Sequence, residues 1–425
     1  MTTTPWGNAT QLRARRLRPG PGSDPRAVTR NQRERMYAAT VAAVAENGYE
    51  ATRVADIVKL SGVSRSAFYK HFEDKLDCFL ATLDELAALA HAELAKHYDP
   101  ALPWEERLRV VADAFLDLLL EQPAAARLCL VEVYAAGPPA VERLDRSVAA
   151  VEAAVARAFE ESPEREGMPR DVVRAIVGGV RKTIHTRVRR GEQAELIEQL
   201  PQLIDWGVGY HAPPEPLRRP RRKPDRGPVP LPDHDVPRER LVTAITDTIA
   251  ERGYPETTII EIAERASASL STFYGNFENK EEALLAALDR EREQSLTAAG
   301  TAFAAASDWP QGIRDGIDAL FAYFAAEPAA ASVAIVDAFT AGHEGLEGGD
   351  ETIRAFHVFL QPGHELRPDS SPLLSEAVCN AVYSLVYRQI REARVERMRE
   401  LAPTATFVTL APFVGTADAF AVASA

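Results

Sequence analysis

The chain repeats itself, and this repeat limits its fold more than any other feature of its 425 residues. Gly48-Tyr49 recurs as Gly253-Tyr254, and the same offset of 205 residues continues without a gap for a long way. Pairs at this offset include Thr52 with Thr257, Ile57 with Ile262, Ser64 with Ser269, Phe68-Tyr69 with Phe273-Tyr274, Phe72 with Phe277, Lys75 with Lys280 and Pro123 with Pro328. A fixed offset over this length is typical of a duplicated unit, so we expect two similar domains in succession.

Within each repeat, apolar residues recur at spacings of three and four, the pattern of amphipathic helices. In the first repeat this predicts a helix that ends at 47–48, a short second helix capped by Thr52, a turn at 61–64 and a very short third helix over 65–71. A fourth helix should follow over 74–96. Two short helices joined by a glycine-containing turn form a helix-turn-helix, whose second helix enters the DNA major groove.

Composition agrees with an all-α chain. The sequence is 46% hydrophobic but only 7% aromatic, and it is rich in the helix formers Ala, Leu, Glu and Arg. No apolar run approaches the roughly 18 residues of a membrane span, and the arginine-rich start lacks a signal-peptide core, so we expect a cytoplasmic protein without a membrane partner. Cys78, Cys129 and Cys379 lie too far apart for a zinc or redox motif and are expected to be small buried hydrophobes.

Two basic segments interrupt an acidic chain whose net charge is -13. Residues 1–36 carry a net charge of +6, and residues 213–232 carry +4. Proline and glycine make much of both segments unsuited to packing, so we expect a disordered arm over 1–31 and a Pro/Arg-rich linker over 212–236. Such charge attracts nucleic acid, although it can equally belong to a solvated tail or linker.

The TetR family of repressors has an N-terminal DNA-binding region that resembles one stretch of this chain, Thr52 followed by VADIVKLSGVSRSAFYKHFEDKLDCFLATLDE. The resemblance covers residues 33 to about 85 closely and 238 to about 290 almost as well. It implies two consecutive TetR-like units in an all-α chain. The expected segments are the arm 1–31, a helix-turn-helix domain 32–85, a helical regulatory domain 86–211, the linker 212–236, a second helix-turn-helix domain 237–290 and a second regulatory domain 291–425.

Double-stranded DNA is the partner that this resemblance implies. Arg65 begins the third helix, where it could reach guanine O6 and N7, while Phe68 and Phe72 share the core-facing side. Tyr69 and Lys75 are similar to family positions that hold phosphate and should set general affinity. The expected DNA-binding residues are Arg53, Ser64, Arg65, Ser66, Ala67, Tyr69, Lys70, His71 and Lys75, with Ser269, Leu270, Ser271, Thr272, Tyr274, Asn276 and Lys280 in the second repeat.

The second helix-turn-helix is expected to bind DNA more weakly than the first. At the 205 offset its recognition helix replaces basic residues: Arg65 becomes Leu270, Lys70 becomes Gly275 and His71 becomes Asn276, while the turn residue Gly62 becomes Ser267. Residues 242–285 have a net charge of -5, against -1 for residues 37–80. The alternative is that Leu270 and Thr272 read the thymine methyls of a different half-site.

The regulatory domains should enclose a cavity for an unknown small-molecule effector, as the resemblance implies. Weak candidate contacts, chosen by helical placement alone, are Tyr134, Arg181, His185, Tyr383 and Tyr387. The sequence has no phosphate-binding loop, no His-Glu-x-x-His and no nucleophile elbow, so we expect no enzyme, no cofactor and no metal. A repressor released by its effector is the first interpretation; a sensor or interaction protein with reduced DNA binding is the alternative.

The assembly has two possible forms. The two units could pack as an intramolecular pseudo-dimer through the helices of 169–209 and 372–412, and the proline-rich linker is long enough to allow this. Alternatively, each unit could pair with its equivalent in a second chain as a homodimer.

Overall fold

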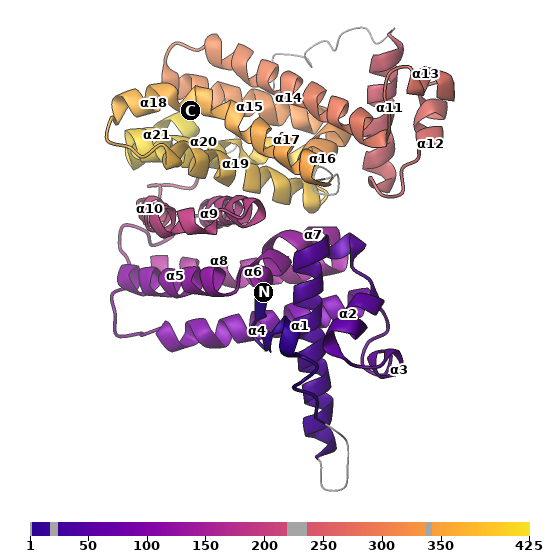
Figure 1. Cartoon of the computed structure of the whole chain (residues 1–425). Coiled ribbons are helices and arrows are strands. Elements are labelled where there is room, and N and C mark those ends of the chain that lie inside the picture. The colour runs from indigo at the N-terminus through magenta and orange to yellow at the C-terminus, as the bar shows by residue number, and fades with distance from the viewer. Residues whose placement is uncertain (1, 18–23, 219–235, 337–341) are drawn as a thin grey trace. The chain divides into compact units, whose positions relative to one another are not determined.

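The computed structural model describes residues 2–17, 24–218, 236–336 and 342–425, without side chains for 342–344. These residues are almost entirely helical, with a single two-stranded hairpin among them (Figure 1), so the predicted all-α class is confirmed. Most of the expected linker, residues 219–235, and residues 18–23 of the expected arm lie outside the described residues. Among the described helices, no single one has the length and apolar character to cross a bilayer; α15 (Trp309–Ala326) and α16 (Pro328–Ile335) reach it together but meet at a bend of 106°.

Two compact units make up the described chain. Unit 1 contains Met1–Ala158 and Ile184–Ile204, and unit 2 contains Phe159–Thr183 and Asp205–Ala425. This division differs from the boundary expected at residue 211, because part of the first repeat finds its packing partners in unit 2. Lys182 forms an ion pair with Asp350 at 2.7 Å, and the hydroxyl of Tyr210 donates to the carbonyl of Val408 at 2.7 Å.

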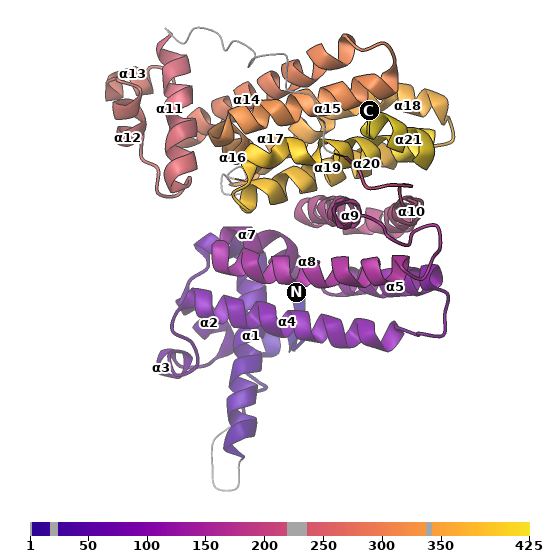
Figure 2. The same ribbon diagram turned by 180° about the vertical axis from the view of Figure 1, so that it is seen from behind.

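Unit 1 begins with a hairpin and continues with the helices of the first repeat (Figure 2), some of which also supply residues to unit 2. Its elements are β1 (Thr3–Thr4), β2 (Gly7–Asn8), η1 (Ala9–Gln11), α1 (Pro25–Ala51), α2 (Val54–Ser61), α3 (Arg65–Phe68), α4 (Lys75–His97), α5 (Trp104–Glu121), α6 (Pro123–Arg127), η2 (Leu128–Glu132), α7 (Val133–Ala135), α8 (Pro138–Phe159), the later part of α9 (Arg170–Arg190), η3 (Gln193–Glu195) and most of α10 (Leu196–Val208).

Unit 2 contains the first part of α9 and the whole described second repeat, in which α11, α12 and α13 lie together at one end (Figure 1). Its elements are α11 (Pro237–Arg252), α12 (Ile259–Arg265), α13 (Leu270–Tyr274), α14 (Lys280–Ala304), α15 (Trp309–Ala326), α16 (Pro328–Ile335), α17 (Gly342–Ala355), η5 (Phe356–Leu360), α18 (Gln361–Leu366), α19 (Leu373–Arg391), η6 (Val395–Leu401), α20 (Ala402–Val414) and α21 (Thr416–Ala423).

Several helices of the two repeats start at aligned residues, which confirms the tandem arrangement. Helices α5 and α15 each contain 18 residues and start at tryptophans one offset apart, and α6 and α16 both start at the proline of the next aligned pair. The long helices α4 and α14 start at the aligned Lys75 and Lys280. The same start residues therefore hold the same helices in place in both halves.

The N-terminal segment is folded on unit 1, so the expectation of a disordered arm over 1–31 is wrong for its described residues. Leu12 is fully buried, and the Trp6 ring lies 5.3 Å from that of Tyr37 on α1. Helix α1 already begins at Pro25, capped by Asp24. The expectation rested on the basic composition of the segment and overlooked Trp6 and Leu12. These two apolar side chains supply the contact area that holds the segment on unit 1.

Candidate nucleic-acid interface

The first helix-turn-helix is fixed by its turn and by two buried rings. Gly62 ends α2 in the left-handed conformation with φ 65°, and the hydroxyl of Ser64 then accepts from the amide of Ala67 at 3.1 Å, which starts α3. Phe68 and Phe72 are almost fully buried, as predicted. Anchoring one side of α3 in this way leaves its opposite side exposed.

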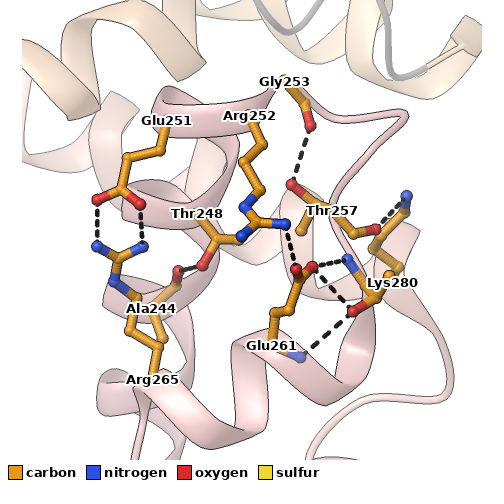
Figure 3. A network of polar contacts seen from close by, with 10 residues as sticks. Ala244, Thr248, Glu251, Arg252, Gly253, Thr257, Glu261, Arg265 and Lys280 are labelled. Carbon is orange, nitrogen blue, oxygen red and sulfur yellow. Dashed lines mark hydrogen bonds and ion pairs between the residues drawn. The ribbon is translucent and has the colours of Figure 1, made fainter.

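The expected cap of α2 was placed one residue too early. Thr52 does not cap this helix, because its hydroxyl donates backwards to the carbonyl of Gly48 at 2.7 Å, where α1 is kinked near its end with φ 74°. Arg53 occupies the cap position instead, and its amide donates to the carboxylate of Asp56 at 2.9 Å. The second repeat repeats the arrangement with Thr257 bonded to Gly253 and Thr258 as the cap (Figure 3).

Most residues proposed to contact DNA in the first repeat lie on one exposed surface. We call it the first reading surface; its members are Arg53, Ser64, Arg65, Ser66, Tyr69 and Lys70, with Ala67 partly buried beside them. His71 is turned towards α1, where its Nε2 lies 2.9 Å from Oε1 of Gln32. Burial, helped by the nearby cations Arg33 and Lys70, lowers the pKa of His71, so this ring is neutral at pH 7.

Lys75 has a structural position that the sequence did not predict. Its ammonium group donates to the carbonyls of Tyr49 at 2.8 Å and Glu50 at 3.3 Å, and it lies 4.1 Å from the centre of the Tyr49 ring. Lys280 makes the matching contacts with the carbonyls of Tyr254 and Thr257, each at 2.8 Å (Figure 3 draws the bond to Thr257). Burial lowers the pKa of both lysines. Lys75 therefore ties the end of α1 to the start of α4, and Lys280 ties the connection that follows α11 to the start of α14.

A groove runs beside the first reading surface, between the N-terminal segment and α2, and sequence reasoning missed its shape. Arg13, Arg16, Lys59 and Arg65 all line it. The guanidinium of Arg13 donates twice to the carbonyl of Lys59, at 3.0 and 2.6 Å, which fixes the segment against the last turn of α2. The arginine run was visible in the sequence, but the contacts that order it were not.

The second helix-turn-helix has the same frame and a different surface. Ser269 caps α13 by accepting from the amide of Thr272 at 3.0 Å, and Phe273 is fully buried. Leu270 is 45% exposed and Tyr274 57%, so apolar and aromatic groups occupy the positions of Arg65 and Tyr69. Ser271 is exposed, whereas the side-chain amide of Asn276 donates to the carbonyl of Thr272 at 2.8 Å.

Two arginines of this second domain, Arg252 and Arg265, are already paired with carboxylates. Arg252 donates to Glu261 at 2.5 Å, and Arg265 makes two hydrogen bonds with Glu251, one of them 2.9 Å long (Figure 3). Ser267 adopts the left-handed conformation with φ 51° in the turn where the first repeat has Gly62. The backbone conformation of the turn is thus the same in both repeats, although serine is less favourable than glycine at a positive φ.

A separate cavity of about 130 Å³ lies within unit 2, walled by α14, α15, α16, α17, η5, α19 and α20. Of the five candidate ligand contacts, Tyr383 lines it, and Tyr134, Arg181, His185 and Tyr387 do not. Tyr134 and His185 contact each other in unit 1 instead, with ring centres 5.6 Å apart. Sequence reasoning missed Glu291, Gly312 and Gly316 in this cavity; the two glycines four apart on one helix face were the available signal.

Comparison with known proteins gives the same two domains. The family described as "Bacterial regulatory proteins, tetR family" matches twice, at residues 37–82 and 241–288. The HTH-type transcriptional regulator CymR of Pseudomonas putida is 28% identical over 118 residues, which cover 27% of this chain and 56% of CymR. The chain thus spans about half the length of this relative.

Among solved structures, the fatty acid degradation regulator FadR of Bacillus halodurans has a TM-score of 0.38 at 17% identity, covering 42% of this chain and 96% of its own. FadR of Bacillus subtilis, solved with stearoyl-CoA, has a TM-score of 0.36 at 16% identity, covering 41% and 97%. The double family match and the aligned helices of the two repeats lead to one conclusion. The chain carries two TetR-like helix-turn-helix domains in tandem, each matching the TetR family model and each followed by a helical domain.

Proposed function

We propose that the chain is a sequence-specific DNA-binding transcriptional regulator of the cytoplasm, without catalytic activity, whose main DNA contacts come from the first repeat. The observation that carries this proposal is the first reading surface, where Arg65 and Lys70 stand exposed on α3 beside a groove lined by Arg13, Arg16 and Lys59. Arg65 would read a base edge, Tyr69 and Lys70 would contact phosphate, and the arginines of the groove would follow the backbone. Lys75 would add positive electrostatic potential near the start of α4.

The test is a selection of bound fragments from a genomic library, followed by affinity measurements on the selected site and a mismatched one. Arg65→Ala should weaken binding to the matched site by about 1–3 kcal/mol and relax selectivity at one base pair. The aligned substitution Leu270→Ala is the control and should change affinity by less than about 0.5 kcal/mol. Equal losses from both variants, or an absence of any selected fragment, would contradict the proposal.

The regulator would respond to a small-molecule effector in the unit 2 cavity and act as a repressor that the effector releases. A chain of contacts supports this. Glu291 lines the cavity, and its carboxylate accepts from Arg290, whose guanidinium also donates to the hydroxyls of Thr243 at 2.8 Å and Thr246 at 3.4 Å on α11. Any shift of α14 on ligand binding would therefore reach the first helix of the second DNA-binding domain.

We also propose that the two repeats associate within one chain as a pseudo-dimer. Helix α9 of the first repeat packs on α19 of the second inside unit 2: Asn380 donates to the hydroxyl of Thr183 at 3.0 Å, and Gly178 and Gly179 permit the close approach. These helices fall within the segments 169–209 and 372–412 expected to form the interface. Sedimentation that finds only a stable two-chain species at low concentration would favour the homodimer instead.

A second candidate function, a sensor or interaction protein, applies to the second repeat alone. It is favoured by the exposed Ile260, Leu270 and Tyr274 and by the paired arginines of that domain. Footprinting would separate the two: under this candidate, damage to α13 leaves the protected DNA region unchanged.

A further inference from the structure

The unit 2 cavity is unfavourable for charged ligands. We propose that it selects an uncharged, apolar molecule, because every charged or hydroxyl-bearing side chain among its described lining residues is already bonded within the protein. This inference rests on the proposed function, since it names the class of the effector. It concerns the cavity itself, however, and can be tested without DNA.

The surface of the cavity is dominated by hydrocarbon. Aromatic rings from three elements reach it, namely Phe303 on α14, Phe324 on α15, and Phe356 and Phe359 on η5. Phe303 and Phe359 lie with their ring centres 5.0 Å apart, so they form one continuous aromatic wall. Such a surface gains free energy by excluding water and favours ring-containing or branched apolar ligands.

Two charged residues occur among the described lining residues, and each is compensated by neighbours outside the cavity. Glu291 is 3% exposed; its carboxylate accepts from the Arg290 guanidinium at 3.1 Å and from the hydroxyl of Tyr323. Arg292 donates to Asp289 at 2.8 Å and lies 3.7 Å from Glu351. A ligand carboxylate or ammonium would find these counter-charges already engaged by protein partners, so its burial here is unfavourable.

The hydroxyl groups that line the cavity are already hydrogen-bonded within the protein as well. Each donates its proton to a backbone carbonyl: Ser295 to Arg292, Thr352 to Gly348, Tyr383 to Ile335 and Thr409 to Ala405, at 2.8–3.0 Å. Cys379 remains a thiol, since burial raises its pKa to about 12. Among its described lining residues the cavity therefore offers a ligand few donors, no exposed anion and no reactive thiolate.

Two glycines explain why this space exists in the second repeat. Gly312 and Gly316 line the cavity on α15, whereas the aligned positions of α5 carry Arg107 and Val111. Arg107 is 7% exposed and donates to the carbonyl of Leu102 at 3.2 Å, so it fills the corresponding position with a long side chain. Duplication followed by substitution at these positions would have freed one repeat for ligand binding.

The experiment compares two fluorescent probes that differ by one sulfonate group, on the full chain without DNA. The neutral probe is N-phenyl-1-naphthylamine, and the anionic one is 8-anilinonaphthalene-1-sulfonate. We expect saturable binding of the neutral probe at one site per chain and at least about tenfold weaker binding of the anion, because its charge would lack a partner. Ile317→Trp, which fills the cavity, should abolish neutral binding, and the aligned Ala112→Trp in the first repeat is the matched control.

Glu291→Gln provides the second arm, because it leaves Arg290 without its carboxylate. The preference for the neutral probe should then shrink several-fold, while circular dichroism reports whether the variant is folded. Tighter binding of the anion to the unaltered chain, or neutral binding that survives Ile317→Trp, would overturn the inference. If the neutral probe binds as expected but never alters DNA affinity, the ligand class stands and the effector role of the proposed function fails.

Discussion

The recognition helices α3 and α13 share a frame and differ at their exposed basic positions, while the exposed serines and the exposed tyrosine are the same in both. In both, a serine caps the first turn and a phenylalanine anchors the buried side, and a lysine at the start of the following long helix donates to backbone carbonyls near the end of the repeat's first helix. On the exposed side, Arg65 and Lys70 of α3 correspond to Leu270 and Gly275 of α13. Residues that hold the backbone have been kept after duplication, and so have the exposed Ser66 and Tyr69, whereas the exposed basic residues have been replaced. The change between the repeats is therefore a loss of positive charge on one face of the helix.

The largest expected effect tests the shared frame. Phe68→Ala should lower the free energy of unfolding of unit 1 by about 3–5 kcal/mol, and Phe273→Ala should do the same for unit 2, because each removes a fully buried ring. Urea unfolding followed by tryptophan fluorescence can separate the units in variants that keep the tryptophans of one unit only, either Trp6 and Trp104 of unit 1 or Trp206 and Trp309 of unit 2. Tyr69→Ala, at an exposed position, is the control. A loss below about 1 kcal/mol in either unit would mean that the frames are not equivalent.

The lysine caps should matter to stability in both repeats and to DNA in only one. Lys75→Met and Lys280→Met keep the aliphatic stem but remove the charged donors, so each should cost about 1–3 kcal/mol of unfolding free energy. Lys75→Met should also weaken DNA binding, and Lys280→Met should not. Chemical denaturation and fluorescence anisotropy on the selected site would measure the two effects, with the exposed Lys70→Met as a variant that alters DNA binding alone.

Releasing the arginines of the second repeat should create DNA affinity where little exists. Glu251→Gln combined with Glu261→Gln removes the partners of Arg265 and Arg252. In an Arg65→Ala background, the slope of log affinity against log salt should steepen by up to about 0.9 per released arginine. Glu256→Gln with Glu264→Gln makes the same change in net charge without touching these pairs. If both double variants steepen the slope equally, the pairing does not restrain the arginines.

A smaller effect is expected from pH, because His71 titrates and its counterpart Asn276 does not. The pKa of His71 is lowered in the folded chain, so the unfolded chain binds more protons as pH falls through the range below about 6.5. The stability of unit 1 should therefore decrease between about pH 7 and pH 5, and His71→Asn should reduce that decrease. Thermal unfolding at both pH values measures the difference. An identical decrease in the variant would assign the effect to other groups.

Local patterns in the sequence were sufficient to predict the helical framework that the two repeats share. The 205 offset and the three-and-four spacing predicted the tandem all-α fold, and Phe68 and Phe72 were correctly placed in the core. These features depend on neighbours within one or two helical turns, which a sequence displays directly.

Features set by long-range contacts were missed. The folded N-terminal segment depends on Leu12 and Trp6 meeting α1, and the backbone role of Lys75 depends on a helix end 26 residues earlier. The cavity depends on small residues of α15 facing α14, as at Gly312, where a Cβ would lie 3.0 Å from the Phe303 ring. Charge and helical position alone selected four ligand candidates that do not line it.

Unit 2 is assembled from segments that are distant in the chain, and this imposes an order on its biosynthesis. Lys182 and Thr183 leave the ribosome 168 and 197 residues before their partners Asp350 and Asn380. At about 5–20 residues per second, the nascent chain waits roughly 10–40 s with the glycine face of α9 uncovered. Chaperone capture during this interval, and not the stability of the finished protein, should then limit the yield of full-length chain when synthesis is fast or the temperature is high.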